Sequence, residues 1–512
     1  MGIQQCLSSN VYLKKKENQV TSHSVGALST VLVGSKLDWP QLLNINKLCL
    51  TQHRLERAKY TPEHYIRGLC THILYAFAWM NSNFTIRAYD LADLSNDWSG
   101  IGMYARVNRL KTFDPELKTL LSVGGWSFGT QLFKQMSRNK TGRSTFINSA
   151  IKFVRDNDFD GIDIDWEYPK GAHDILSYSL FIKELREAMN LESSSNRKRP
   201  LLLTVAVSAG ETTIRNAYDI PQLAKHVDFV LLMSYDFHGG WETKTNLHNA
   251  LYSRGDEKGK QGAWNIDWAA NYWAEKGMPR RKIIIGIATY GRGWTLKDAQ
   301  RNGIGSPGTA STATRFIGES GIAAYYELCE MLANRAQRYW EPRSQVPYLV
   351  YGDQWFTYDD TESIKNKMAW LKRQHFGGAF VWTLDFDDFN GRCSSSNSVV
   401  YPLVGVIARE LAGIDITHLN SFTTLQPPTL SSTTKPLSAT SLQKLSPNDE
   451  VNCRQLADAF SCTTDGFFPD LSDCHRFYRC VGGIIYMFDC PSGSAFNSMT
   501  QFCDHLENAT CN

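Results

Sequence analysis

Residues 160–169 read Asp-Gly-Ile-Asp-Ile-Asp-Trp-Glu-Tyr-Pro and place acidic side chains at alternate positions, Asp163, Asp165 and Glu167. Alternate side chains of a strand share one face, so three carboxyl groups would lie in a row. Such acidic runs are usually solvated turns, but the Ile residues between the acids favour a buried strand. Crowding and burial raise the pKa of a carboxyl group toward the range of a general acid. We therefore predict a catalytic cavity in which Glu167, at the strand's C-terminal end, is that acid.

Five blocks of this sequence, in the same order, resemble the family 18 glycoside hydrolases, the chitinases. One of these blocks is the D-x-x-D-x-D-x-E pattern that runs from Asp160 to Glu167. The other blocks are LSVGGWSFG at 121–129, MSYDFHG at 233–239, TYGR at 289–292 and GGAFVWTLD at 377–385. The resemblance covers about residues 52 to 411.

The resemblance implies hydrolysis of β-1,4 N-acetylglucosamine linkages in chitin by substrate-assisted, retaining catalysis, in which the substrate's own N-acetyl oxygen replaces an enzyme nucleophile. Glu167 would act as general acid and then as base. Asp165 would orient and stabilise the acetamido group, and Asp163 would share charge and protons with Asp165. We expect these three groups to titrate as a coupled set.

Further site residues follow from the other blocks. The resemblance implies that Tyr235 donates a hydrogen bond to the N-acetyl group and that Asp236 binds the sugar. A tyrosine at a strand end is more often a core residue, but the adjoining Met233 and Asp236 match the family block. Trp382 would form the floor under the scissile sugar, because sugars present flat C–H faces to aromatic rings. Lesser subsite candidates, which could equally be packing residues, are Trp126, Trp241, Tyr290 and Arg292.

Two polar residues near these blocks are assigned no chemistry. Asp160 has an odd offset from Asp163, so it lies on the other face and is interpreted as a structural cap. No ligand at zinc spacing accompanies His238, which favours a histidine with satisfied hydrogen bonds over a metal site. The sequence has no dinucleotide fingerprint or phosphate loop, and we expect no cofactor.

Apolar strand-like runs alternate with helical patterns, which predicts a parallel sheet in an α/β fold. Seven runs are visible, at 71–77, 119–124, 161–167, 201–207, 229–235, 283–288 and 379–384, and an eighth strand is expected near 46–50. The sequence therefore predicts a (β/α)8 TIM barrel whose catalytic blocks lie at the C-terminal strand ends. About 90 residues separate the last two runs, which predicts an inserted α+β subdomain between strands 7 and 8.

These patterns divide the chain into four parts. Residues 1–45 form an atypical N-terminal segment, and residues 46–415 form the catalytic barrel, with the insertion at about 293–358. Residues 416–451 are rich in Ser, Thr and Pro, which is typical of an extended, O-glycosylated linker. Residues 452–512 resemble a peritrophin-A type chitin-binding module, a small disulfide-rich β domain.

The chain has 12 cysteines, and seven of them, beginning with Cys453, lie in the last 60 residues. This density predicts a disulfide framework and an oxidising compartment. The module's framework would use Cys462, Cys474, Cys480, Cys490, Cys503 and Cys511, whose connectivity the spacing leaves open. The resemblance implies a Cys329–Cys393 pair, and Cys49 and Cys70 could form another. We expect a secreted, extracellular protein, although Met1-Gly-Ile-Gln-Gln lacks the features of a signal peptide.

Composition limits the partners. Hydrophobic residues make up 42% and charged residues 21% of 512 residues, as in soluble globular proteins. A net charge of +3 gives no reason to expect nucleic acid or a membrane surface. We expect a monomer that binds chitin and chitooligosaccharides. The alternatives are a catalytically silent chitin-binding lectin, which would typically lack the acid at Glu167, and a structural matrix protein that binds chitin through its C-terminal module.

The first strand departs from the family pattern. Residues 46–54 read Asn-Lys-Leu-Cys-Leu-Thr-Gln-His-Arg, without the Tyr and Trp that the family ordinarily has there. A first strand of only a few residues would leave part of strands 2 and 8 unpaired. We therefore expect a poorly closed barrel and an unstable chain.

Overall fold

The computed structural model describes residues 42–49, 54, 58–96, 99–257, 259–393 and 399–416, and, toward the C-terminus, 466–470, 473, 475–481, 484–490, 494–497 and 502–505. The chain divides into two compact units near residue 425. Most of the predicted N-terminal segment and the predicted linker lie outside the described residues, as does Cys453.

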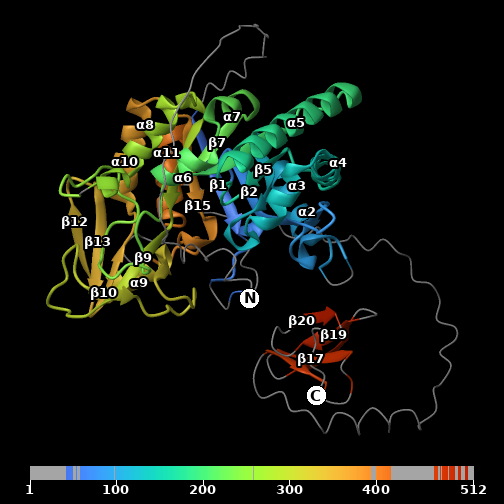
Figure 1. Ribbon diagram of the computed structural model, residues 1–512. Coiled ribbons are helices and arrows are strands. Elements are labelled where there is room, and N and C mark those ends of the chain that lie inside the picture. Colours follow the sequence, from blue (N-terminus) through green and yellow to red (C-terminus); the bar gives the residue numbers. More distant parts are fainter. Residues whose placement is uncertain are drawn as a thin grey trace, which may run out of the picture. The chain divides into compact units, whose positions relative to one another are not determined.

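In the larger unit, the described residues form a closed barrel of eight parallel strands surrounded by helices (Figure 1). The barrel strands, in chain order, are β1 (Leu43–Cys49), β2 (His72–Met80), β4 (Lys118–Gly124), β5 (Gly161–Asp165), β6 (Leu202–Ser208), β7 (Phe229–Met233), β8 (Ile283–Ala288) and β15 (Gly378–Trp382). A short strand, β3 (Ile86–Ala88), lies antiparallel to the end of β2. The predicted (β/α)8 fold is confirmed.

The first strand closes this barrel, and the expectation that it would fail to do so is wrong. β1 begins at Leu43, before the predicted boundary at residue 46. Its residues 43–46 pair with β15, and its residues 45–49 pair with β2. The upstream residues Leu43 and Ile45 are buried and supply the apolar contacts that the shorter predicted strand lacked. Neither β2 nor β15 is left with a free edge here.

Apolar side chains fill the space on both sides of the barrel wall. Inside the barrel, Leu43 and Ile45 of β1 pack with side chains from the other strands, among them Leu74, Leu120 and Phe229. Outside it, the strands pack against helices α2 (Gly102–Phe113), α3 (Gln131–Arg138), α4 (Lys140–Asp156), α5 (Ala172–Asn196), α6 (Glu211–Ala217), α7 (Ile220–His226), α8 (Ile266–Glu275), α10 (Thr361–Arg373) and α11 (Pro402–Ala412). Burial on both faces explains why the strands read as short, almost continuous apolar runs.

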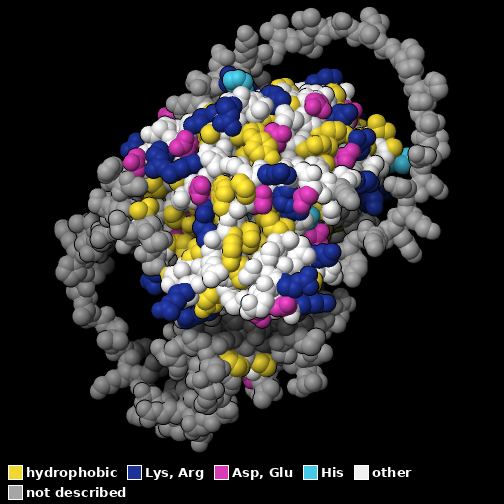
Figure 2. Space-filling view, turned by 90° about the vertical axis from the view of Figure 1, so that its left-hand side faces the viewer, with side chains coloured by type: hydrophobic (Ala, Val, Ile, Leu, Met, Phe, Trp, Pro, Cys, Tyr) yellow, Lys and Arg dark blue, Asp and Glu magenta, His cyan; other side chains and the backbone are white. Residues whose placement is uncertain are grey.

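The inserted subdomain follows β8 directly. Its antiparallel sheet has the order β10 (Gly308–Ala310), β9 (Tyr290–Leu296), β14 (Gln354–Thr357), β13 (Val346–Tyr351) and β12 (Gln337–Glu341), and β11 (Ile322–Ala324) also pairs with β9. Helix α9 (Tyr325–Ala333) lies between β11 and β12 in the chain. The subdomain is thus α+β, as predicted, but its first strand starts at Tyr290 and not at 293. On the side of the molecule that carries β12 and β13, hydrophobic side chains are interspersed with Lys and Arg (Figure 2).

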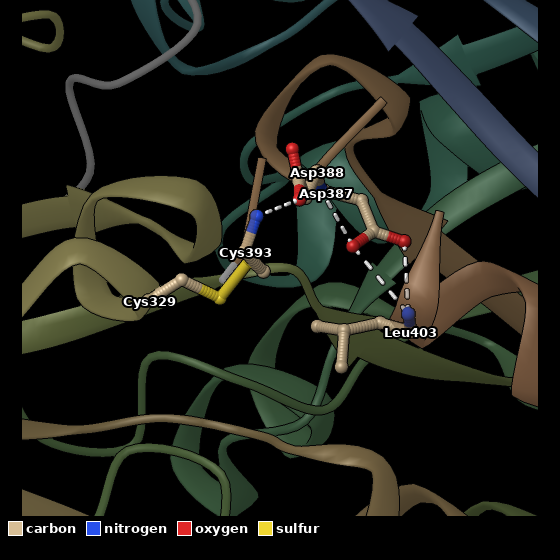
Figure 3. Close-up of a disulfide and its surroundings, with 5 residues drawn as sticks. All are labelled: Cys329, Asp387, Asp388, Cys393 and Leu403. Atoms are coloured by element: carbon tan, nitrogen blue, oxygen red, sulfur yellow. Dashed lines mark hydrogen bonds between the residues drawn. A yellow bond between two sulfur atoms is a disulfide. The ribbon is translucent and has the colours of Figure 1, made fainter. Parts of the chain in front are cut away.

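One disulfide ties this subdomain to the end of the barrel. Cys329 of α9 is bonded to Cys393, which follows β15, with a Cα–Cα distance of 5.3 Å (Figure 3). The segment that carries Cys393 is held by two adjacent carboxylates. Asp388 accepts a hydrogen bond from the Cys393 amide, and Asp387 accepts one from the Leu403 amide (Figure 3). This is the pairing that the resemblance implied. The other suggested pair, Cys49 with Cys70, stays a prediction, because the side chain of Cys49 lies outside the described residues.

The smaller unit consists of short antiparallel strands. β16 (Gly466–Pro469), β17 (Arg476–Val481) and β18 (Ile484–Asp489) form one sheet, and β19 (Ser494–Asn497) pairs with β20 (Phe502–His505). Cys490 is disulfide-bonded, and the connectivity of the other predicted module cysteines lies outside the described residues. In neither unit does a described helix combine the length and the apolar character needed to cross a membrane.

Candidate active site

A cavity of about 320 Å³ lies at the C-terminal ends of the barrel strands. This is the end at which TIM barrels hold their active sites. Eight of the predicted site residues line the cavity: Asp165, Glu167, Tyr235, Trp126, Met233, Asp236, Tyr290 and Trp382. The others, Asp163, Arg292 and Trp241, do not line it, but Arg292 contacts Asp236, which does.

The acid row has the predicted alternation. Asp163 and Asp165 are buried inside the barrel, whereas Ile162, Ile164 and Trp166 belong to the core between the sheet and the helices. Strand β5 ends at Asp165, so Glu167 lies just beyond the strand and not within it, as the run 161–167 had suggested. The row therefore leads from the barrel interior to the cavity, and Glu167 is its outermost member.

Each of the two inner carboxylates is held by its own partners. Asp163 accepts hydrogen bonds from the Ser122 hydroxyl at 2.6 Å and from the Thr204 hydroxyl at 2.7 Å. Asp165 accepts one from the Lys47 ammonium group at 2.6 Å, and Lys47 also lies 3.4 Å from Asp163. No hydrogen bond joins the two carboxylates in the described residues. Lys47 faces both carboxylates, and the sharing of protons between them stays a prediction.

Glu167 is held in its protonated form near neutral pH. Burial raises its pKa, the negative charge of Asp165 raises it further, and the charge of Lys47 opposes the rise, so that the pKa reaches about 8. Burial also raises the pKa of Asp165 above its ordinary value, against the opposing charge of Lys47. A general acid needs a proton to donate at the working pH, and Glu167 has one.

Two glycines allow strand β4 to end against the acid row. The Gly125 amide donates a hydrogen bond to the Asp165 carbonyl at 2.8 Å. A Cβ atom on Gly124 would lie 2.2 Å from that same carbonyl, and one on Gly125 would lie 2.6 Å from the Phe77 ring. Both residues also have positive φ angles, which favour glycine. The Gly-Gly pair of the LSVGGWSFG block at 121–129 thus permits the close approach of β4 and β5.

Asp236 is fixed as a carboxylate beside the cavity. The Arg292 guanidinium donates to both of its oxygens at 2.7 Å, and the Tyr290 hydroxyl donates to one at 2.8 Å. Burial alone would raise the pKa of Asp236, but the charge and hydrogen bonds of Arg292 hold it well below its usual range. Arg292 thus reaches the site through Asp236.

Aromatic rings form much of the cavity wall. Trp382, at the end of β15, stacks on Phe77 with ring centroids 5.8 Å apart. Tyr235 packs edge-on against Phe380 and Tyr290, and burial raises its pKa well above the usual value, so its hydroxyl keeps its proton. Trp241 is 38% exposed and lies under the Arg292 guanidinium, outside the cavity lining.

The sequence interpretation missed several residues here. Phe77 and Trp264 line the cavity, and Lys47, Ser122 and Thr204 support the inner carboxylates. A signal for Lys47 was available: it follows Leu43 and Ile45 at the same alternate spacing, and a lysine on a buried strand face needs an anionic partner.

The two residues to which no chemistry was assigned make structural contacts. Asp160 accepts a hydrogen bond from the Thr119 amide at 2.9 Å and lies 3.3 Å from Lys111. His238 is buried and contacts Glu242 at 2.8 Å. Among the described residues, no group of three or more His, Cys, Asp or Glu side chains is placed to hold a metal ion.

A closed barrel with a carboxyl row leading into a cavity walled by aromatic rings is typical of a glycoside hydrolase. The model of the glycosyl hydrolases family 18 matches residues 51–387, and the chain belongs to this family. The model of the chitin-binding Peritrophin-A domain matches residues 462–511.

Individual relatives agree with the family match. A probable endochitinase of Caenorhabditis elegans is 49% identical over 90% of this chain and 90% of its own length. The crystal structure of an immunomodulatory active chitinase from Trichuris suis is 44% identical, with a TM-score of 0.70, over 73% of this chain and 100% of its own. Human YKL-39, described as a pseudo-chitinase with retained chitooligosaccharide binding, is 38% identical, with a TM-score of 0.68, over 73% of this chain and 100% of its own.

Proposed function

We propose that this chain is a chitinase that cleaves β-1,4 linkages between N-acetylglucosamine units by substrate-assisted, retaining catalysis. The observation that carries the proposal is the pair formed by Glu167 and Asp165. A carboxyl group that keeps its proton to about pH 8 lies beside a carboxylate held by a buried lysine, and both line one cavity.

Glu167 donates its proton to the leaving glycosidic oxygen. Loss of this proton leaves a carboxylate that then takes a proton from the attacking water, so the same side chain serves in both steps. The charge of Asp165 opposes the ionisation of Glu167, and Lys47 moderates that effect.

The nucleophile in this scheme is the substrate's own N-acetyl oxygen. A retaining glycosidase of the common kind uses a second carboxylate as nucleophile. The neighbouring carboxylate here is Asp165, which is 1% exposed and ion-paired with Lys47 at 2.6 Å, so it is poorly placed to bond to a sugar carbon. Asp165 instead accepts the N–H of the acetamido group, and the Tyr235 hydroxyl donates to that group's oxygen. Trp382 supports the sugar ring from below.

A silent lectin is the alternative that the comparison with human YKL-39 raises, because that protein is described as binding chitooligosaccharides as a pseudo-chitinase. Glu167 favours hydrolysis here. A site that only bound sugar would gain nothing from a carboxyl group held in its protonated form by burial and by a neighbouring charge.

The need for the acetamido group tests the proposal. We expect the enzyme to cleave the fully acetylated hexamer of N-acetylglucosamine and to leave the fully deacetylated hexamer intact, because the latter has no internal nucleophile. A hexamer of β-1,4-linked glucose, which is uncharged, is the control for the positive charge of the deacetylated substrate. Chromatography of the products at matched times is the measurement. Cleavage of the deacetylated or glucose hexamer at a rate close to that of the acetylated one would contradict the mechanism.

The C-terminal unit supplies a second contact with the polymer. Its match to a chitin-binding domain supports attachment to insoluble chitin, where a tethered second site raises the local concentration of the barrel. Secretion completes the proposal and is supported by the Cys329–Cys393 disulfide, because disulfides persist in oxidising compartments.

A further inference from the structure

Lys47 is a buried cation at the base of the active site. It lies on β1 and is 0% exposed. Its ammonium nitrogen lies 5.4 Å from the centroid of the Phe77 ring and 5.5 Å from that of Trp382, and both rings line the cavity. A lysine that is fully desolvated needs compensating negative charge. Asp165 at 2.6 Å and Asp163 at 3.4 Å provide it.

The two oxygens of Asp165 are in different situations. Oδ2 accepts the hydrogen bond from Lys47. Oδ1 is buried and has no hydrogen-bond partner among the described residues, and Asp165 lines the cavity. A buried carboxylate oxygen without a donor is costly unless a ligand supplies one. The oxygen that remains open on Asp165 is therefore the one available to a substrate N–H group.

We propose that Lys47 is a positioning residue for Asp165: it holds Oδ2 by an ion pair across the barrel, keeps the carboxylate ionised and leaves Oδ1 to accept the acetamido N–H. The inference rests on the proposed function, because it concerns how Asp165 serves that reaction. Lys47 does not touch the substrate and acts through Asp165.

Lys47 also has a place in the charge balance of the site. Asp163 accepts two hydrogen bonds from hydroxyl groups, which are neutral. Among the described residues, Lys47 is the one cation within 4 Å of the acid row. Removing it would leave burial and the charge of Asp163 to raise the pKa of Asp165 without opposition, and it would remove the larger of the two influences that lower the pKa of Glu167. The other titratable groups that face this cluster are Tyr168, Tyr178, Tyr218, Tyr235 and Asp236.

The test is the pH profile of the Lys47→Met variant of the full chain, acting on the acetylated hexamer. Met keeps most of the side chain's length and removes its charge. In the unaltered enzyme, kcat/KM falls on the acid side as Asp165 is protonated and on the basic side, near pH 8, as Glu167 loses its proton. We expect the variant to lose at least about 10-fold in kcat at neutral pH, and both limbs to move to higher pH by about 1 pH unit or more.

The matched control is Lys367→Met. Lys367 is also a buried lysine paired with a buried carboxylate, since its ammonium group lies 2.6 Å from Asp359, but neither residue lines the cavity. This variant should lower thermal stability and leave the shape of the pH profile unchanged. If Lys47→Met also lowers stability without moving either limb of the profile, Lys47 has a structural role only and the inference is wrong.

A double variant covers the case in which Lys47→Met does not fold. Lys47→Met combined with Asp165→Asn replaces the ion pair by two neutral groups of similar size. If Lys47 acts through Asp165, adding Lys47→Met to Asp165→Asn should change kcat by less than about 3-fold. A further loss of about 10-fold or more would overturn the inference. Full activity of Glu167→Gln would instead refute the proposed function itself, so the two failures can be told apart.

Discussion

Glu167→Gln should abolish hydrolysis of N-acetylglucosamine oligomers while leaving their binding nearly unchanged. The amide keeps the shape of the side chain and removes the proton that the leaving oxygen needs. General acid catalysis of this kind contributes about 100-fold to 10,000-fold to the rate, and we expect kcat to fall by that amount. The measurement is the steady-state rate on the acetylated hexamer, with binding followed by calorimetry.

Glu211→Gln is the control for this substitution. Glu211 is another glutamate that lines the cavity, and its carboxylate lies 2.8 Å from Arg215. Glu211 belongs to α6 and not to the acid row, so the loss of kcat should stay under about 10-fold. A Glu167→Gln variant that turns over as fast as the Glu211→Gln variant would refute the assignment of Glu167.

Asp165→Asn should be the second most damaging change. The neutral amide no longer balances the positive charge that develops as the acetamido oxygen bonds to the sugar carbon, and it leaves Lys47 without its closest partner. Removing a group that stabilises developing charge typically costs about 100-fold to 1,000-fold in kcat. We expect a loss in this range with little change in KM, because the charge develops after binding.

Asp160→Asn is the control for Asp165→Asn, because it shows whether any substitution in the acidic motif lowers kcat. Asp160 belongs to the same sequence pattern, but it caps the backbone at Thr119 and contacts Lys111. Its substitution should lower stability slightly and leave kcat within about 2-fold of the unaltered enzyme, because surface ion pairs contribute little. Equal losses of kcat in the two variants would argue that the motif is structural.

Much of this architecture is predictable from the sequence because the responsible signals are local. The acidic side chains alternate with apolar ones, Asp163, Asp165 and Glu167 with Ile162, Ile164 and Trp166. This alternation decides which side chains face the cavity, and the structure has it. Short apolar runs separated by helical patterns are enough to predict the barrel.

The parts that could not be predicted depend on contacts between distant strands. Strand β1 closes the barrel because it begins upstream of the expected strand, where Leu43 and Ile45 pack inside the barrel. The pairing of Lys47 with Asp165 joins residues 118 positions apart across the barrel interior. The sequence of the acid row alone does not show that Lys47, from a distant strand, lies beside it.

The anomeric configuration of the first product tests the central claim most directly. Attack by the substrate's N-acetyl oxygen on the face opposite the leaving group, followed by attack of water from the face that the leaving group occupied, gives two inversions and a product of the original configuration. Proton NMR of the acetylated hexamer, recorded in the first minutes before mutarotation, should therefore show new reducing ends in the β form. New reducing ends that first appear in the α form would contradict substrate-assisted catalysis by this site.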